Sequence, residues 1–174
     1  MVGVNDREEG RKEHYNAHFE KGCDMISYID GVVMWDLKKF EDERGWLMEC
    51  WRADELIDDD IPDMTYVSMT LPGKSRGPHE HRDQTDLFIF AGPGDFEVHL
   101  WEREGGYKET FTLGESCPMA VLVPPGVIHG YRNVSDKPGL VINGPNRLYL
   151  GPGKRYKVDE IRHEGSSKYS FTEP

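Results

Sequence analysis

Short apolar segments, separated by turn-forming residues, follow one another along most of this chain. From residue 66 onward they recur at roughly ten-residue spacing, and glycine or proline stands between them. They cover residues 66–71, 87–91, 96–101, 107–113, 119–123 and 140–142. Two further β-rich runs, 32–35 and 46–51, precede them. With 19 glycines and 11 prolines in 174 residues, the pattern predicts an all-β sandwich, barrel or jelly roll rather than a helical fold.

The chain divides into three stretches of different composition. Residues 1–27 are polar with mixed charge, and we expect an arm or a short helix outside the core there. Residues 28–150 carry the strand pattern and form the predicted domain. Residues 151–174 are rich in Lys, Arg, Glu and Ser, and we expect them to pack on or near the barrel. The acidic run 52–63 is interpreted as a solvated connection, because its carboxylates lack the spacing of a calcium loop.

The overall charge and the cysteine count limit the partners and the compartment. Asp and Glu number 32 against 21 Lys and Arg, which gives a net charge of −11. Duplex nucleic acid requires a basic surface, although a locally basic pocket can still hold a small anionic ligand. No apolar run is long enough to cross a membrane, and the N-terminal residues do not form a signal peptide. Three cysteines, an odd count, are typical of unlinked thiols in a reducing compartment. We therefore expect a cytoplasmic protein that binds neither nucleic acid nor membrane.

Three histidines and one aspartate occur in two polar clusters. His79 and His81 stand two residues apart at a strand, so their side chains point to the same face, and Asp86 follows across a short turn. His129 enters another candidate strand after a Pro-Pro-Gly turn. A single histidine is most often a hydrogen-bonded structural residue. The combination instead predicts a shared pocket that could bind zinc, nickel, iron or manganese.

The same two clusters resemble the two sequence motifs of the cupin superfamily. Its members fold as a double-stranded β-helix, the cupin type of jelly roll, with the site inside the barrel. Asp86 stands where the cupin motif usually has glutamate, and its carboxylate is a shorter but competent oxygen ligand. The resemblance implies a metal site made of His79, His81, Asp86 and His129.

A narrower resemblance is to the dTDP-4-dehydrorhamnose 3,5-epimerases. Residues 40–46 resemble their F-x-D-E-R-G-aromatic signature, residues 68–79 their S-x-S-x-x-G-x-x-R-G-x-H segment, and residues 123–131 their I-P-x-G-x-A-H-G-F motif. The similarity runs from about residue 29 to residue 150. It implies a homodimeric jelly roll that isomerises a nucleotide-linked 4-keto-6-deoxy sugar. In that reaction a histidine removes the proton alpha to the ketone, and a tyrosine returns a proton on the other face of the enolate.

The resemblance also implies roles for individual residues. His79 corresponds to the base, Arg76 to a ligand-binding arginine beside it, and His129 to a pocket histidine. Arg44 corresponds to an arginine that binds the diphosphate of the substrate from the partner subunit, and its alternative role is a salt bridge within its own turn. Trp46 could stack on a thymine or sugar face, with a place in the core as the alternative.

This chain departs from the epimerase pattern at three positions. No tyrosine occurs near residues 142–143, where the catalytic tyrosine is expected, and residues 164–174 contain no aspartate to support the base. Asp86 aligns with the active-site lysine, which reverses the charge beside the developing enolate. A like charge ~4 Å away costs about 4 kcal/mol at an effective dielectric of about 20, on the order of a thousandfold in rate. Tyr66 and Tyr131 remain as candidates for the catalytic acid, with packing in the barrel as the alternative.

The metal and epimerase interpretations compete for His79, which cannot be a metal ligand and a free base at once. His81 offers an alternative base. The R-G-x-H-x-H sequence also resembles the dTDP-sugar 3,4-ketoisomerases, which are related cupins. Three functions stay open: a keto-sugar epimerase or isomerase, a non-catalytic cupin that binds a small molecule, and a metal-dependent cupin with another substrate. Elsewhere, His99 is expected at the surface or at an interface.

Overall fold

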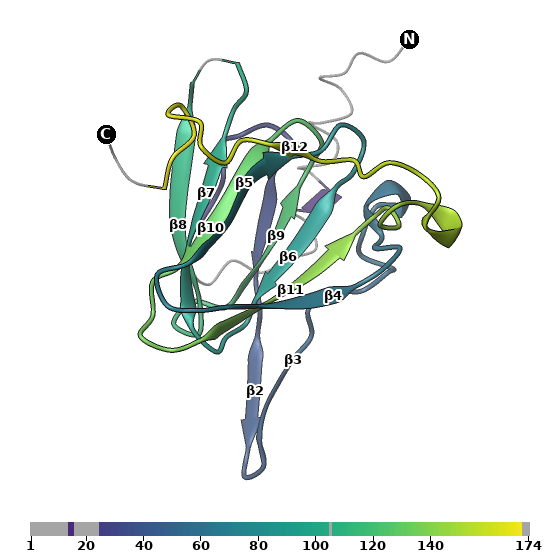
Figure 1. The fold of residues 1–174 in the computed structure, drawn as a ribbon. Helices are drawn as coiled ribbons and strands as arrows, with labels where there is room; N and C mark the ends of the chain where they lie inside the picture. The colour runs from purple at the N-terminus through teal and green to yellow at the C-terminus, as the bar shows by residue number, and fades with distance from the viewer. Residues whose placement is uncertain (1–13, 16–24, 105, 172–174) are drawn as a thin grey trace.

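The structure is a computed structural model, and it describes residues 14–15, 25–104 and 106–171. Almost all of its regular structure is antiparallel β-strand (Figure 1), which confirms the predicted jelly roll. The described residues contain no helix with the length and apolar character that a membrane crossing requires. The arm expected over residues 1–27 lies largely outside the described residues.

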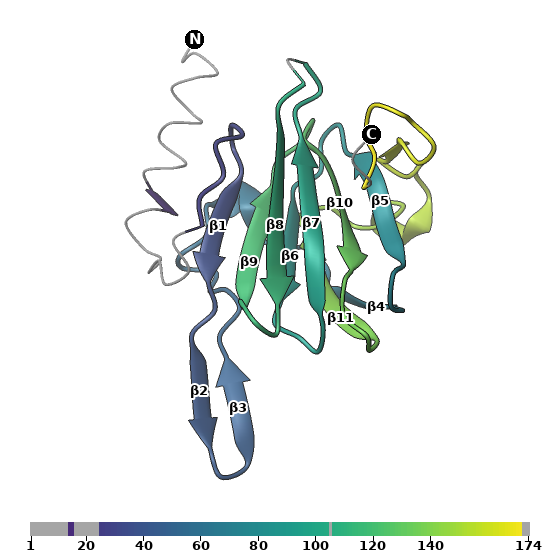
Figure 2. The ribbon, with the colours of Figure 1, turned by 90° about the vertical axis from the view of Figure 1, so that its left-hand side faces the viewer.

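Within the described residues, two five-stranded sheets form the barrel and one two-stranded hairpin projects from it (Figures 1 and 2). The first sheet has the order β1 (Val33–Asp36), β9 (Met119–Val123), β6 (Asp86–Phe90), β11 (Gly139–Pro145) and β4 (Tyr66–Thr70). The second has the order β12 (Ile161–Arg162), β5 (Ser75–Glu80), β10 (Ile128–Asn133), β7 (Asp95–Trp101) and β8 (Lys108–Gly114). The hairpin consists of β2 (Lys39–Asp42) and β3 (Gly45–Met48). The short 3-10 helices are η1 (Asp58–Asp60) and η2 (Pro152–Lys154).

Strand β6 shows how the core is arranged. Its residues Phe88 and Phe90 belong to the main core cluster, together with side chains of the second sheet such as Phe96. The alternate residues Leu87 and Ile89 point to the opposite face and belong to a second cluster. Because both faces of β6 are covered, its sequence is a continuous apolar run rather than an alternating one.

The strands that carry most of the site have the weakest apolar signal. Strands β5 and β10 lie outside the predicted apolar runs, because their sequences, SRGPHE and IHGYRN, are largely polar. They pair antiparallel, and His79 and His129 are Cα partners in that pairing. The predicted segment 140–142 is part of the longer strand β11. Pairing between β5 and β10 therefore places the two histidine clusters of the sequence side by side.

His99 on β7 is buried, so the prediction that it lies at the surface or at an interface is wrong. Its relative exposure is 2%. The imidazole stacks on Trp101 with 5.3 Å between the ring centroids, and it meets the edge of the Phe171 ring at 5.1 Å. Phe171 comes from the C-terminal segment, and the alternation of residues within β7 gives no sign of that cover.

The C-terminal segment runs across the second sheet and is tied to β5 (Figure 1). Its strand β12 pairs with β5 so that Arg162 is the Cα partner of His79. Glu80, which is 2% exposed, accepts hydrogen bonds from Arg103 and lies 2.8 Å from Nε2 of His163. The buried carboxylate thus anchors the segment beside the histidine clusters.

Candidate active site

Four side chains from the two sheets meet at one point inside the barrel. His79 lies on β5 and His81 directly after it, Asp86 begins β6, and His129 lies on β10. One ligand atom of each residue lies within 4.8 Å of those of the other three. Asp86 is 1% exposed and His129 is 3% exposed, so the cluster is shielded from bulk water. The four residues, which we call the His/Asp cluster, could hold a metal ion.

The two carboxylate oxygens of Asp86 have different surroundings. Oδ1 accepts hydrogen bonds from the side-chain amides of Gln84, at 2.9 Å, and Asn143, at 3.3 Å. Oδ2 lies 3.0 Å from Nε2 of His81 and 3.3 Å from Nε2 of His129. Oδ2 of Asp86 and Nε2 of His129 make no well-aligned hydrogen bond among the described residues, and their contacts are these close approaches within the cluster. Buried polar atoms without a well-aligned hydrogen bond are rare, and here they converge on a common point.

The outer nitrogens of two imidazoles are bonded to backbone carbonyls. Nδ1 of His129 donates to the carbonyl of Val127 at 2.9 Å, and Nδ1 of His81 donates to the carbonyl of Asp159. These bonds leave Nε2 of both rings directed at the cluster. Such outer hydrogen bonds fix the tautomer and orientation of metal-binding histidines. Three imidazoles and one carboxylate are also donors that zinc, nickel, iron and manganese accept, so the residues present fit a divalent ion.

The cluster holds its groups in different protonation states. Burial lowers the pKa of His79 to about 3, and the neighbouring His129 and His81 rings add to that effect. Burial acts to lower the pKa of His81 as well, but Asp86 outweighs it and raises that pKa above its ordinary value. Burial acts to raise the pKa of Asp86, and the nearby His129 and His81 rings outweigh it and lower that pKa. At neutral pH, His79 is therefore an uncharged imidazole beside an anionic Asp86.

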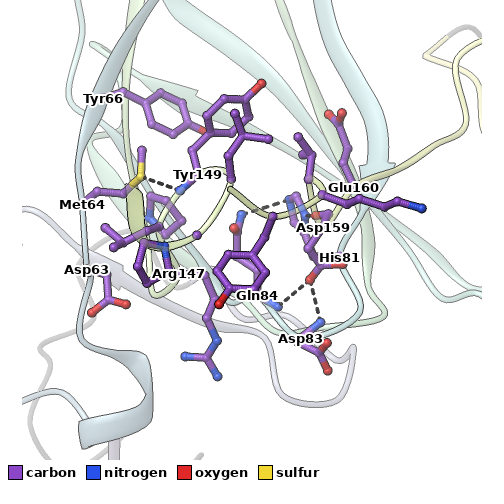
Figure 3. A pocket seen from close by; sticks show the side chains of 18 of the residues that line it. Asp63, Met64, Tyr66, His81, Asp83, Gln84, Arg147, Tyr149, Asp159 and Glu160 are labelled. Atoms are coloured by element: carbon purple, nitrogen blue, oxygen red, sulfur yellow. Dashed lines mark hydrogen bonds between the residues drawn. The ribbon is translucent and has the colours of Figure 1, made fainter. Parts of the chain in front are cut away.

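A cavity of about 740 Å³ lies against His79 and His81. Its walls come from the β11–β12 connection, from the segment that precedes β4, and from the loop between β5 and β6 (Figure 3). Asp86 and His129 are buried and do not line it. His79 and His81 are thus the members of the His/Asp cluster that face the cavity.

Asp159 of the C-terminal segment shapes the loop between His81 and Asp86. Its carboxylate accepts hydrogen bonds from the backbone N–H groups of Arg82, Asp83 and Gln84, at distances of 2.8 to 3.2 Å. One residue of the tail thereby fixes a turn of the loop and, through its carbonyl, the ring of His81.

Tyr66 is the first residue of β4, which pairs with β11, and it lines the cavity. Its hydroxyl accepts a hydrogen bond from the Asn143 amide at 2.7 Å, and the two residues are Cα partners. The described residues offer no acceptor for the phenol proton itself. Burial, with a smaller contribution from the charge of Asp86, raises the pKa of Tyr66 to about 12. The epimerase pattern expects its tyrosine near residues 142–143. The protonated phenol of Tyr66 therefore lies next to that position, on the neighbouring strand.

Tyr131 and Arg76 do not reach this cavity. The hydroxyl of Tyr131 lies 2.8 Å from Oγ of Ser68, and its ring packs in the core with Phe88. Arg76 donates to Oγ1 of Thr70 at 3.1 Å and to a backbone carbonyl of β4. Neither residue lines the cavity in the single chain.

Arg44 and Trp46 lie on the hairpin, away from the His/Asp cluster (Figures 1 and 2). Arg44 forms an ion pair with Asp42 of the same turn, with Nη2 2.5 Å from Oδ2. Trp46 is 51% exposed and is not a core residue. Within one chain, the structure does not bring these two residues to the cavity.

Four residues of the site were not predicted from the sequence: Gln84, Asn143, Asp159 and Glu160. Glu160 is of particular interest, because Oε1 of its carboxylate lies 3.9 Å from Nδ1 of His79. The epimerase pattern expects an aspartate near this histidine, and residues 164–174 contain none. Glu160 is a carboxylate that lies near His79 instead. Only the pairing of β12 with β5 brings it there, and the polar composition of the tail gave no signal of that pairing.

Comparison with known proteins identifies relatives of the chain. Residues 30–143 match the family model described as FdtA: WxcM-like, C-terminal. The probable low-salt glycan biosynthesis epimerase Agl13 of Haloferax volcanii is 35% identical over 127 residues, which are 70% of this chain and 81% of the relative. The spore coat polysaccharide biosynthesis protein SpsL of Bacillus subtilis is 34% identical over 119 residues, which are 66% of this chain and 78% of the relative.

Solved structures share the fold at low sequence identity. The dTDP sugar isomerase from Desulfovibrio desulfuricans G20 aligns with a TM-score of 0.68 and 23% identity over 79% of this chain and 86% of that one. RmlC of Legionella pneumophila, a dTDP-6-deoxy-D-glucose-3,5-epimerase, aligns with a TM-score of 0.65 and 21% identity over 79% and 75% of the two chains. QdtA, a sugar 3,4-ketoisomerase from Thermoanaerobacterium thermosaccharolyticum, gives a TM-score of 0.59 and 16% identity over 80% and 92%. At these sequence identities the structural similarity shows the jelly-roll fold alone.

Proposed function

The chain belongs to the family described as FdtA: WxcM-like, C-terminal, and from that membership we propose that it is an isomerase of a nucleotide-linked keto sugar. The substrate would be a dTDP-4-keto-6-deoxy sugar, and the reaction would begin with removal of the proton alpha to the ketone. One relative is named a glycan biosynthesis epimerase, and solved proteins of the same fold act on dTDP-sugars. The observation that carries the proposal is the neutral imidazole of His79 in the wall of a 740 Å³ cavity.

His79 is the proposed base. An uncharged imidazole is the form that can accept a proton, and the lowered pKa of His79 keeps it uncharged at neutral pH. The same lowering weakens the ring as a base, so the mechanism requires Glu160 to raise the pKa of His79 in the bound complex. The Glu160 carboxylate at 3.9 Å from Nδ1 would stabilise the imidazolium that forms, and its approach in the bound complex would orient the ring. The proton would leave the carbon next to the ketone, and an enolate would result.

Tyr66 is the proposed acid. Its pKa of about 12 keeps the phenol protonated, and Asn143 occupies only an acceptor site of the hydroxyl oxygen. The proton on that oxygen is therefore available for transfer to the enolate from its side of the cavity. Tyr131 is the less suitable of the two tyrosines, because it is 6% exposed and its hydroxyl is paired with Ser68.

The negative charge of the enolate needs a positive group to stabilise it, at the place where the epimerases have a lysine. His81 can supply it, because its raised pKa favours an imidazolium that offsets the negative charge of Asp86. A divalent ion in the His/Asp cluster would supply a comparable positive charge by Lewis-acid polarisation of the ketone. The two arrangements differ in the role of His79, which is a base in the first and a ligand in the second.

We also propose that the protein acts as a homodimer in the cytoplasm. The exposed side chains of the hairpin, Phe40, Trp46 and Leu47, are 52%, 51% and 69% exposed and suit an interface with a second copy. Arg44 on the same hairpin would then reach the partner's cavity. Cys50 and Cys117 are free thiols, as is usual in a reducing compartment.

Solvent exchange tests the proposal. The protein is incubated in heavy water with dTDP-4-keto-6-deoxyglucose, and deuterium at each carbon is followed by NMR. Deuterium at C3 in a product that keeps the ketone at C4 indicates a 3-epimerase. Deuterium at C4 in a product with the ketone at C3 indicates a 3,4-ketoisomerase. Deuterium at C3 and C5 indicates a double epimerase. Binding of the nucleotide sugar without exchange at any of these carbons contradicts the proposal and leaves a non-catalytic binding protein.

A second candidate function is a metal-dependent cupin with an unrelated small substrate. The observation in its favour is the set of four metal-type donors within 4.8 Å, two of which are buried atoms without a well-aligned hydrogen bond. Elemental analysis of protein prepared without a histidine tag tests it. One equivalent of zinc, nickel, iron or manganese would favour this candidate. No metal, together with an unchanged thermal midpoint on addition of zinc or nickel, would contradict it.

A further inference from the structure

The carboxylate of Asp86 is surrounded by hydrogen-bond donors, and this arrangement orients the amide of Asn143. The side-chain nitrogens of Gln84 and Asn143 lie 2.9 and 3.3 Å from Oδ1 of Asp86. The imidazoles of His81 and His129 present Nε2 to Oδ2 at 3.0 and 3.3 Å. Asp86 is 1% exposed, so these groups stabilise its charge in place of bulk water. An amide oxygen in place of the Asn143 nitrogen would repel the carboxylate, so the nitrogen faces Asp86.

The same nitrogen of Asn143 is bonded to the phenol of Tyr66. Nδ2 donates to the hydroxyl oxygen of Tyr66 at 2.7 Å, and the two residues are Cα partners between β4 and β11. Both hydrogens of the amide group are then used, one on Asp86 and one on Tyr66. An amide nitrogen can donate but cannot accept, so the phenol is the acceptor in this bond. The charge of Asp86 therefore leads, through one amide, to a phenol proton that points away from Asn143.

The amide of Asn143 keeps this orientation although its own oxygen gains nothing from it. Oδ1 of Asn143 is buried and has no hydrogen-bond partner among the described residues. Buried acceptors without a partner are rare and unfavourable. A rotated amide would let the oxygen accept the phenol proton of Tyr66, but it would also turn that oxygen toward the carboxylate of Asp86. The orientation is thus set by the charge of Asp86.

Tyr131, the other candidate acid, lacks this control. Its hydroxyl lies 2.8 Å from Oγ of Ser68, and either of these two hydroxyl groups can be the donor. Tyr131 also does not line the cavity, whereas Tyr66 does (Figure 3). Of these two tyrosines, Tyr66 alone combines a fixed direction of the phenol proton with access to the cavity.

We propose that Asn143 is a positioning residue that turns the phenol proton of Tyr66 toward the cavity, because the charge of Asp86 holds its amide. Asn143 does not line the cavity, so it acts through Tyr66 and not on the ligand. The inference rests on the proposed function for the role of Tyr66 as the acid. It gives Asp86 a second role, since its carboxylate directs the acid as well as pairing with His81.

Reversal of the bond by Asn143→Asp tests the proposal. A carboxyl group carries at most one hydrogen, so it cannot donate to Asp86 and Tyr66 together, and the phenol turns to donate to the new carboxyl group. In heavy water with the dTDP-keto sugar, deuterium exchange should persist because His79 is unchanged. Product should form about 100-fold more slowly, as in Tyr66→Phe.

The double variant with both Asn143→Asp and Tyr66→Phe separates a positioning role from a general effect on the fold. It should be no slower than the slower single variant, because both changes remove the same proton from use. Asn143→Leu removes the amide without reversing the bond and should slow product formation about tenfold. That variant keeps the test available if Asn143→Asp does not fold.

A second readout does not depend on turnover. The Cζ resonance of Tyr66 is followed by NMR in protein with isotope-labelled tyrosine and is assigned by its loss in Tyr66→Phe. It should move downfield in Asn143→Asp, because the phenol then donates to a carboxyl group. Asn146→Asp is the matched control, since Asn146 is a buried amide that bonds to Thr85 and Asp59. It should leave the resonance unchanged and the rate of product formation close to wild type.

Three outcomes overturn the inference. They are product formation at the wild-type rate by Asn143→Asp, a double variant slower than both single variants, and an unchanged Cζ resonance in Asn143→Asp. A wild-type protein that exchanges no proton of the keto sugar contradicts the isomerase proposal instead. In that case the Cζ resonance still decides whether Asn143 directs the phenol of Tyr66.

Discussion

At the scale of single residues, the proposed chemistry depends on Asp86 and His79. Asp86 is a buried anion where the epimerase pattern has a lysine, and an enolate near it meets a like charge. The structure offers a compensation in His81, whose Nε2 lies 3.0 Å from Oδ2 of Asp86 and whose pKa is raised. His79 stays uncharged beside this pair. The site therefore places a neutral imidazole, His79, beside an ion pair of His81 and Asp86.

Removing the phenol of Tyr66 should separate proton removal from proton return. In Tyr66→Phe we expect deuterium exchange to persist, because the base is intact, while the epimerised or isomerised product forms about 100-fold more slowly or worse. NMR of product and of deuterium content in one sample measures both.

Tyr131→Phe is the matched control, since it also removes a phenol hydroxyl from the barrel but outside the cavity. It should keep the wild-type rate and lose about 1 kcal/mol of stability with its hydrogen bond to Ser68. Wild-type product formation by Tyr66→Phe would show that another group is the acid.

Metal ions should inhibit proton exchange rather than support it. Under the proposed mechanism His79 acts as a free base, so exhaustive chelation should leave the exchange rate unchanged. Zinc or nickel should suppress exchange as one equivalent binds, because the His/Asp cluster then includes His79 as a ligand. Exchange that disappears on chelation and returns with one metal ion would assign the site to metal-dependent chemistry.

At the scale of elements, the sequence predicted the strands with apolar runs and missed the contacts of the tail. Strand β9 was found with its bounds, Met119–Val123, because both its faces are buried. Strands β5 and β10 carry polar site residues and so gave no apolar run. His79, His81, Asp86 and His129 could be found because metal-type and cupin-like spacing is local in sequence. Glu160 and Asp159 could not, because the two-residue strand β12 that positions them has no periodicity to detect.

The buried histidine of β7 should make the protein less stable in mild acid. Burial lowers the pKa of His99, so the unfolded chain binds a proton near pH 6.5 that the folded chain does not. Stability therefore falls as the pH drops below about 6.5 and continues to fall until the lowered pKa of His99 is reached.

Thermal unfolding at a series of pH values measures this dependence. Since other histidines contribute, the comparison is between wild type and His99→Asn, which should show a smaller loss of stability between neutral and mildly acidic pH. His14→Asn is the control, because His14 lies away from β7 and bonds to the backbone carbonyl of Glu55. An identical pH dependence in wild type and His99→Asn would contradict the prediction.

At the scale of the whole molecule, the hairpin is the feature that a single chain leaves unexplained. Strands β2 and β3 project from the barrel (Figure 2), and their apolar side chains Phe40, Trp46 and Leu47 are 52%, 51% and 69% exposed. Edge strand β4 adds Val67 and Met69, which are 61% and 58% exposed. A monomer rarely exposes such a surface, whereas a symmetric dimer could bury it on both copies.

Sedimentation velocity should show a dimer. Leu47→Asp should shift the protein to monomer, because it places a charge in the proposed interface at a side chain that is 69% exposed in one chain. Val134→Asp is the control, at a 45% exposed apolar residue in the turn after β10. A wild-type protein that sediments as a monomer, or a Leu47→Asp variant that stays dimeric, would contradict the proposed interface.

The most direct measurement is deuterium incorporation by a matched pair of histidine variants. Wild type, His79→Gln and His163→Gln are compared in heavy water with the dTDP-keto sugar, with dTDP affinity measured in parallel. His163 is the control, because it bonds to Glu80 and does not line the cavity. We expect His79→Gln to lose exchange by at least about 100-fold while it still binds dTDP, and His163→Gln to exchange at a rate close to wild type. Exchange that persists at the wild-type rate in His79→Gln would contradict the assignment of His79 as the base.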